Sequence, residues 1–197
     1  MGSTPIYSIP FADPTDLVRD WPALSEDVAE QVALGLDAAG GLVAVKFVVK
    51  TNIQATSVAA NAQTLVTGLE ISHAVSDPSN RVILWANVLQ SWAANDNNDT
   101  TLSIYADGVE LSRGDAAGSR QRRAKFGRAA GSALGAIPQN HVEEFEPMTT
   151  DSVDYEVRAG HFATSTQTIY INRSNADTDN ATGVRGVSTL MLMEVKV

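Results

Sequence analysis

Residues Thr101–Ser112, TLSIYADGVELS, carry the strongest strand–turn–strand signal in the chain. Apolar and polar residues alternate on both sides of Asp107-Gly108, which is the period of two that a half-buried strand requires. A two-residue type I′ turn needs positive φ at both central positions, and the Asp-Gly pair meets that need at low steric cost. The stretch therefore predicts a β-hairpin and sets the expectation of an antiparallel fold.

Short apolar or alternating runs continue on both sides of this hairpin, with turn-rich sequence between them. The further strands that we predict are Leu42–Val49, Leu65–Val75, Arg81–Trp92, Val153–Ala159, Gln167–Asn172 and Ser188–Val195. Ser76–Asn80 and Ser174–Gly183 have the composition of loops. About eight short strands with little helix predict an all-β fold, an antiparallel β-sandwich that is most economically a jelly roll, over residues 41–197.

The bulk composition narrows the class of protein. Of the 197 residues 44% are hydrophobic and 19% charged, the net charge is −9, and there is no cysteine. Disulfides and thiolate zinc sites are therefore excluded. A negative chain argues against nucleic-acid binding, because counterion release requires a basic surface. No apolar run approaches the roughly 20 residues that span a bilayer, and no secretory signal opens the chain. We expect a protein made in a cytoplasm, with no membrane insertion.

Residues 1–21 have the composition of an extended attachment segment. Pro5, Pro10 and Pro14 follow one another too closely for a regular helix, and each favours extended geometry in the residue before it. The apolar side chains of this segment are too numerous for a solvated linker. They are Ile6, Tyr7, Ile9, Phe11 and Leu17. They require a groove, which lies either on the chain's own domain or on a neighbouring protein.

Residues 22–40 predict a short neck helix with Ser25 as its N-cap and Gly40-Gly41 at its end. One apolar stripe recurs at a spacing of four residues. It consists of Leu24, Val28, Val32 and Leu36. The stripe packs either on the β domain or against the same stripe of symmetry mates. Because an isolated helix of this length is marginal in water, we expect the β domain to carry most of any oligomerisation.

Motifs that support chemistry are sparse. His73, His141 and His161 are far apart in the sequence and have no carboxylate at metal-ligand spacing, so packed or surface histidines are the simpler interpretation. No nucleophile elbow, phosphate-binding loop or dinucleotide fingerprint is present. One group of carboxylates has the residue type of a glycosidase pair, although solvated carboxylates are common on an acidic protein. It comprises Glu143, Glu144, Glu146, Asp151, Asp154 and Glu156. We expect no enzyme activity, no cofactor and no metal.

Positive charge is concentrated in residues 113–128, RGDAAGSRQRRAKFGR, which hold six of the chain's 14 basic residues and one acidic residue, Asp115. The basic residues are Arg113, Arg120, Arg122, Arg123, Lys125 and Arg128. Such segregation forms a positive patch on a negative body. Three partners stay open for this basic patch: the Glu143–Glu146 cluster of a neighbouring subunit, the same cluster within the chain, and a foreign anionic ligand such as a cell-surface glycan.

Two tryptophans lie on one predicted strand, Arg81–Trp92. Trp85 and Trp92 are an odd number of positions apart, so a regular strand sends them to opposite faces of its sheet. One ring is expected in the core. The other, which we place at Trp92, is a candidate for a sugar-stacking contact, an intersubunit contact or a partly exposed ring.

Two stretches, about a third of the chain, resemble a known class of proteins. The opening TPIYSIPFADPTDLVRDWPALSEDVAEQVALGLDAAG is similar to the N-termini of small virion proteins of tailed bacteriophages, in which an attachment peptide leads into a short helix. The end TIYINRSNADTDNATGVRGVSTLMLMEVKV looks like the last two strands of the β heads of phage fibre and minor tail proteins. Unlike long tail fibres, the chain has no repetitive shaft.

This resemblance implies a homotrimeric structural protein, made in the host bacterium's cytoplasm and located in the virion. It implies an N-terminus anchored to a capsid, neck or tail protein and an outward jelly-roll head, as in a head fibre, a capsid decoration or a minor tail protein. Two alternatives are kept. One is an adhesin whose head binds a host surface glycan, and the other is a small polysaccharide depolymerase that uses the acidic group.

Overall fold

The structure is a computed structural model that describes residues 41–92, 98–116, 118, 122–129, 135–176 and 184–197. The predicted attachment segment and neck helix lie outside these residues. The described residues form β1 (Leu42–Lys50), β2 (Gln54–Val58), β3 (Gln63–His73), β4 (Arg81–Trp92), β5 (Asn98–Ala106), β6 (Val109–Glu110), β7 (Lys125–Ala129), β8 (Ile137–Phe145), β9 (Val153–His161), β10 (Gln167–Ile171) and β11 (Ser188–Val195). They contain no helix that could cross a membrane.

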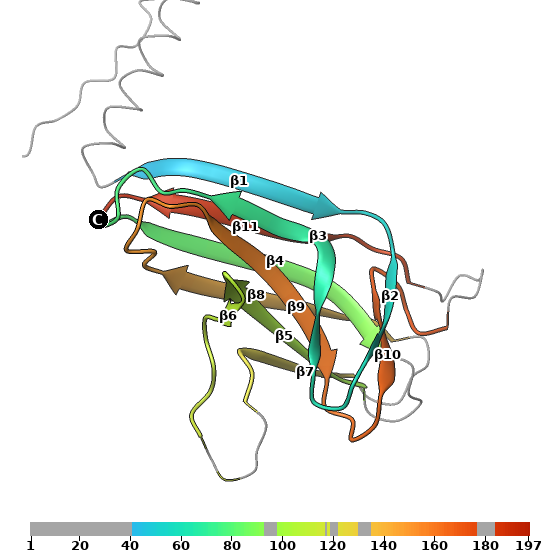
Figure 1. Cartoon of the computed structure of the whole chain (residues 1–197). Helices are drawn as coiled ribbons and strands as arrows, with labels where there is room; N and C mark the ends of the chain where they lie inside the picture. The colour runs from blue at the N-terminus through green and yellow to red at the C-terminus, as the bar shows by residue number, and fades with distance from the viewer. Residues whose placement is uncertain (1–40, 93–97, 117, 119–121, 130–134, 177–183) are drawn as a thin grey trace, which may run out of the picture.

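The strands form two antiparallel sheets that pack face to face (Figure 1). Sheet A has β1, β11, β4, β10 and β2 in that order, with β8 on the free side of β4. Sheet B has β3, β9, β5 and β6 in that order, and β7 pairs with β5 beside β6. The expectation of an all-β, antiparallel sandwich is therefore confirmed.

Several strands lie end to end and act as one interrupted strand. β11 pairs with the first half of β4 and β10 with its second half, while β1 and β2 continue one another along the other side of β11 and β10. β6 and β7 continue one another along β5 in the same way. When two strands that lie end to end are counted as one, each sheet is four strands wide. The chain passes repeatedly from one sheet to the other. This is the layout of a jelly roll.

The core fills the space between the sheets with alternate side chains from both. Leu84 and Leu192 of sheet A and Leu102, Ile104 and Tyr155 of sheet B are completely buried. Strand β9 shows the alternation that the sequence led us to expect over Val153–Val157. In β5, by contrast, every residue from Thr100 to Ala106 except the half-buried Tyr105 is buried, with Leu102 and Ile104 in the core. The sandwich is therefore held by one continuous apolar layer.

The hairpin predicted within Thr101–Ser112 is present between β5 and β6. Asp107 and Gly108 have φ values of 47° and 76°, both positive, as a type I′ turn requires. Asp107 is held further by β9, because its Oδ1 accepts a hydrogen bond from the amide of Asp154 at 2.9 Å. The strand predicted at Arg81–Trp92 has the same bounds as β4. Strands β2, β7 and β8 were not predicted.

Candidate interaction surface

The outer face of sheet A is apolar across the width of the sheet. The register aligns Phe47 of β1, Met191 of β11, Trp85 of β4 and Val142 of β8 in one row. A neighbouring row continues it with Val45, Met193 and Ile83. We call the outward side chains of these rows, together with the adjacent Val49, the apolar face. Its members are Val45, Phe47, Val49, Ile83, Trp85, Val142, Met191 and Met193.

The large side chains of the apolar face are open to solvent. The exposed fractions are 59% for Phe47, 47% for Trp85 and 56% for Val142. A shallow hollow of about 220 Å³ lies between the rings of Phe47 and Trp85. Its lining consists of Phe47, Trp85, Asn87, Thr189 and Met191. Exposed apolar patches of this kind often take part in interactions, so the apolar face is the candidate interaction surface of the described residues.

Polar groups border the apolar face at both ends of the strands. At one end, the guanidinium of Arg81 pairs with Glu144 and, at 2.8 Å, with Glu146. At the other end, the register places Asn87 beside Asn140. An apolar centre with a polar border is the anatomy of a protein–protein contact.

The centre of the outer face of sheet B is polar and internally hydrogen-bonded, whereas Phe126 of β7, which pairs with Thr101, is 51% exposed. The Gln63 amide donates to the hydroxyls of Thr101 and Ser103 at 3.1 and 3.2 Å. The Tyr105 hydroxyl donates to the Gln63 carbonyl oxygen at 3.1 Å. These groups satisfy one another, so this face has no comparable need for a partner.

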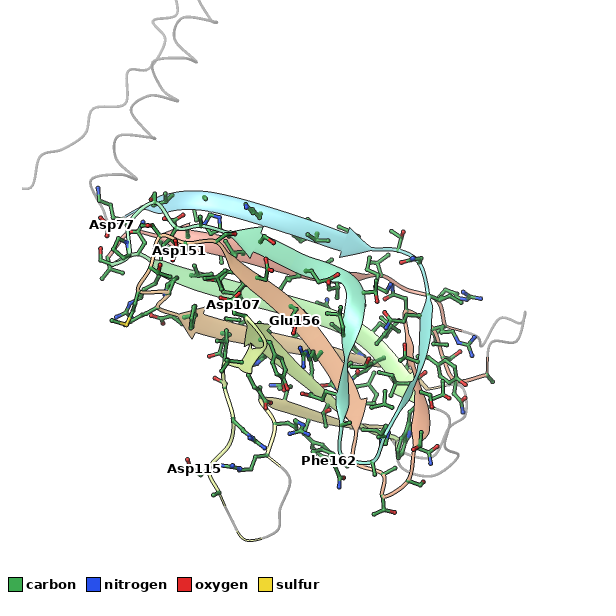
Figure 2. All side chains as sticks on the ribbon, in the orientation of Figure 1. Asp77, Asp107, Asp115, Asp151, Glu156 and Phe162 are labelled. Carbon is green, nitrogen blue, oxygen red and sulfur yellow. The ribbon has the colours of Figure 1, made fainter. Side chains whose placement is uncertain are left out.

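The same network crosses β9 because one position there has no side chain. A Cβ placed on Gly160 would lie 2.3 Å from the backbone oxygen of Ala62. Beyond it, Arg158 donates to Glu156 at 2.7 Å and stacks over the Tyr105 ring at 4.3 Å. Figure 2 shows Glu156 on the strand of sheet B that crosses the front of the sandwich. The two outer faces of the sandwich thus differ sharply in polarity.

A buried ionic cluster fixes the end of β11 beside the start of β1. The Glu194 carboxylate accepts hydrogen bonds from the Ser76 amide and hydroxyl, each at 2.8 Å, from Asn80 at 2.6 Å and from His73 Nε2 at 2.8 Å. Burial opposes ionisation of this carboxyl, but the hydrogen bonds from Asn80, Ser76 and His73 outweigh it and lower its pKa. The cluster ties the β3–β4 loop to β11 and so supports the apolar face from behind.

The basic patch lies on the loop between β6 and β7 and on β7 itself. Figure 2 shows Asp115 on this loop, which projects away from the sandwich. Arg113 lies 3.8 Å from Glu110, and Arg123 donates to the backbone oxygen of Asn61 at 2.6 Å. Arg122 and Lys125 are also described, whereas Arg120 and the side chain of Arg128 lie outside the described residues.

The acidic group is divided between the two sheets. Glu144 and Glu146 form ion pairs with Arg81, and the Glu143 carboxylate lies 3.0 Å from His141 Nε2. These residues are on or next to β8, whereas Asp154 and Glu156 are on β9. Among the described residues, no group of three or more His, Asp or Glu side chains is placed to hold a metal ion. Within the described residues, the carboxylates of the Glu143–Glu146 cluster thus form their ion pairs with Arg81 and His141, and not with the basic patch.

The two tryptophans do lie on opposite faces of sheet A, but not in the order expected. Trp92 is 5% exposed, and its ring centroid lies 5.4 Å from that of His161. A sugar-stacking contact at Trp92 is therefore wrong, because the core covers its ring. Trp85 is the exposed ring, because even-numbered residues of β4 point inward and odd-numbered ones outward up to Leu89.

Sequence reasoning missed the apolar face, although a signal for it exists. An antiparallel strand with one solvated side alternates apolar and polar residues, as β9 does in VDYEVRA. By contrast, β1 (LVAVKFVVK) and β11 (STLMLMEV) are apolar on both sides over most of their length. Such runs are typical of strands that are covered on both faces.

The sequence matches no protein-family profile and no curated protein. Two solved structures of infectious bursal disease virus, of the Gt and Gx strains, contain chains similar in fold, with TM-scores of 0.31 and 0.32 and identities of 11% and 12%. Both matches cover 78% of this chain but only 38% and 37% of those chains. At this level of similarity, function has to be argued from the chain's own surfaces.

Proposed function

We propose that the protein is a non-enzymatic structural component of a tailed-phage virion, a homotrimer anchored by its N-terminus. The observation that carries the proposal is the contrast between the two outer faces of one small sandwich, one apolar and exposed, the other polar and satisfied. A domain that worked alone would have no use for the exposed aromatic and aliphatic row Phe47–Met191–Trp85–Val142. A domain that assembles with other subunits can bury this row in a contact between them.

Two features of the sequence support a phage particle as the place where the protein assembles. The proline-rich segment with Ile6, Tyr7, Ile9, Phe11 and Leu17 resembles the attachment peptides of small phage virion proteins. The apolar stripe of the neck helix ends at Leu36, and residues 37–41 separate it from β1. In this proposal residues 1–21 dock on a capsid, neck or tail protein, residues 22–40 form the neck, and the jelly roll faces outward.

The anchor is tested by deleting residues 1–20 and measuring incorporation into particles. The proposal expects purified particles without the protein, while the truncated chain remains a soluble oligomer. The matched control is Val109→Asp in the full chain, a change on an exposed hairpin residue far from the anchor in sequence, which should be incorporated normally. Normal incorporation of the truncated chain would refute the anchor.

An adhesin is the second candidate, and one observation favours it. Trp85 presents an exposed ring beside Asn87 and Thr189 in the hollow of the apolar face, and a flat ring beside polar groups suits a sugar. The adhesin predicts saturable binding of the intact protein to host cells that is lost in Trp85→Ala. The structural role predicts that Trp85→Ala alters the oligomer and leaves any binding to cells unchanged.

A further inference from the structure

We infer that His161 is a pH-sensitive switch, which joins the two sheets while its ring is neutral and separates them when the ring takes up a proton. His161 is the last residue of β9 in sheet B. Its Nε2 lies 2.9 Å from the backbone oxygen of Val58, the last residue of β2 in sheet A. The two sheets are therefore linked through this ring at one end of the sandwich. The inference concerns a single chain and does not depend on the proposed assembly.

The hydrogen-bond partners of the ring determine which of its nitrogens carries the hydrogen. A backbone carbonyl only accepts, so Nε2 must donate to the oxygen of Val58. A backbone amide only donates, and the Ala163 amide lies 3.1 Å from Nδ1, so Nδ1 must accept. His161 is therefore held as the neutral imidazole with its hydrogen on Nε2.

The folded protein offers no acceptor for a second hydrogen on this ring. A hydrogen on Nδ1 would point at the N–H of Ala163 and abolish the bond between them. His161 is only 1% exposed, and its ring packs on that of Trp92 with the centroids 5.4 Å apart. A charge buried without a hydrogen-bond partner is costly. Uptake of a proton therefore requires that the chain around Ala163 moves away from the ring.

No counter-charge for a protonated His161 lies among the described residues. The surrounding elements carry few charged or titratable side chains. They are Arg123 against the β2–β3 turn, Lys125 on β7, Arg158 on β9 and Tyr170 on β10. Asp99 on β5 and Arg128 on β7 have side chains outside the described residues. None of the four described groups forms a hydrogen bond or an ion pair with His161, and three of them are cations, which oppose a further positive charge.

The other two histidines respond to acid in the opposite way. His73 Nε2 lies 2.8 Å from the Glu194 carboxylate, and His141 Nε2 lies 3.0 Å from that of Glu143. A proton on either ring gains an ion pair, so mild acid does not break these contacts. Because the contacts of His161 need a neutral ring and those of His141 do not, His141 serves as the matched control.

Opening of the switch would also loosen the strand at the foot of the basic patch. Phe162 follows His161 directly, and its ring lies against that of Phe126 on β7 with the centroids 5.1 Å apart. Figure 2 shows Phe162 at the end of the sandwich where β9 ends. Lys125 of the basic patch is next to Phe126 on β7. Movement of Phe162 and Ala163 away from the ring would therefore remove a contact that holds β7.

The first test is urea unfolding of the full-length protein at one fixed protein concentration, from about pH 7.5 to about pH 5, a range that spans the titration of an unfolded histidine near pH 6.5. His161→Gln is the informative variant, because its amide can donate to Val58 and accept from Ala163 but takes up no proton. We expect the unfolding constant of the unmodified protein, divided by that of His161→Gln, to rise about tenfold for each pH unit below about 6.

The sign follows from proton uptake. The unfolded chain binds a proton at residue 161 that the folded protein excludes, so stability falls as the pH falls through this range. The range lies above 4.5, the ordinary pKa from which the folded protein lowers that of Glu194, so the two effects are separated. His141→Gln should keep the loss of stability that the unmodified protein shows in acid.

The second test reads the ring directly and needs no variant. Nitrogen NMR of the unmodified, histidine-labelled protein should show one protonated and one unprotonated ring nitrogen for His161 in the folded state throughout this range. A folded-state ring that takes up a second proton near pH 6.5 would refute the inference, as would a ratio of unfolding constants that does not change with pH. The proposed function depends on molar mass and incorporation into particles, so either idea can fail while the other stands.

Discussion

Removal of the buried carboxylate in Glu194→Ala should be among the most damaging single changes in the domain. The side chain accepts four hydrogen bonds, two from Ser76 and one each from Asn80 and His73. Without it, all four donors lose their acceptor in a place where Asn80 and His73 are themselves buried. The β3–β4 loop would then separate from β11, whose outward residues belong to the apolar face.

The expected size follows from the cost of leaving buried partners unpaired. Leaving a buried polar group without its partner typically costs about 1–3 kcal/mol, and more where the lost partner is charged, so losing four hydrogen bonds to one carboxylate should cost about 3–5 kcal/mol. Against a usual domain stability of about 5–15 kcal/mol, this is a large share. For a domain of this length, it corresponds to a fall in melting temperature of about 6–20 °C. The control is Glu144→Ala, whose carboxylate pairs with Arg81 at an exposed site and should cost less than about 1 kcal/mol.

The assay is urea unfolding of both variants and the unmodified protein at one fixed protein concentration, followed by tryptophan fluorescence at several pH values. Because the folded protein lowers the pKa of Glu194, the ionised form contributes stability above its ordinary value of 4.5. That contribution is lost as the pH falls through the lower, folded-state pKa. The stability gap between Glu194→Ala and the unmodified protein should therefore be widest near neutral pH and narrow in acid.

Two results would refute this reasoning. A loss no larger than that of Glu144→Ala would mean that the hydrogen bonds to Glu194 do not hold the loop in place. A gap that stays constant from neutral pH down to pH 3 would mean that the charge of the carboxylate contributes nothing and that only lost packing is measured.

The remaining predictions concern other parts of the sandwich. Gly160→Ala forces a Cβ to within 2.3 Å of the Ala62 backbone oxygen and should cost about 1–3 kcal/mol in urea unfolding, whereas equal stability would show that the strands separate freely there. Leu192→Ala removes a fully buried side chain from the core and should cost about 2–5 kcal/mol in the same assay. Charge reversal at Arg122 and Lys125 should leave stability within about 0.5 kcal/mol and weaken any salt-sensitive contact with an anionic partner, which a pull-down at two salt concentrations measures.

The fold was largely predictable because its central strands have clear patterns. Strands β4, β5, β9 and β11 combine alternation or continuous apolar runs with turn signals on either side, and the Asp107-Gly108 turn fixes one register. These strands occupy the middle of the sheets, where burial on at least one face imposes a pattern on the sequence.

The strands that were missed all lie at sheet edges. Strands β2, β7 and β8 each pair with one neighbour only. Pro138 and several carboxylates obscured β8, yet an edge strand tolerates proline and charge because one side of its backbone faces water. The basic stretch obscured β7 in the same way. Edge strands need less apolar sequence, so sequence patterns reveal them less well.

The interaction surface was not predicted because it depends on register between distant strands. Phe47, Trp85, Val142 and Met191 form a row only after β1, β11, β4 and β8 have paired. The two-sided apolar character of β1 is typical of a strand that is covered on both faces, but it does not show which other residues lie on the same face. The two tryptophans of β4 show another limit of sequence patterns. The alternation of side chains along a strand correctly predicted that Trp85 and Trp92 lie on opposite faces of the sheet, but it did not show which of these faces is the core.

The central claim is that this chain is an assembly unit, and its molar mass in solution tests that claim most directly. Light scattering on the full-length protein at neutral pH should give three times the chain mass of 20.9 kDa, held over a wide range of concentration. A mass of 20.9 kDa at every concentration, with Trp85 still open to a soluble fluorescence quencher, would contradict it.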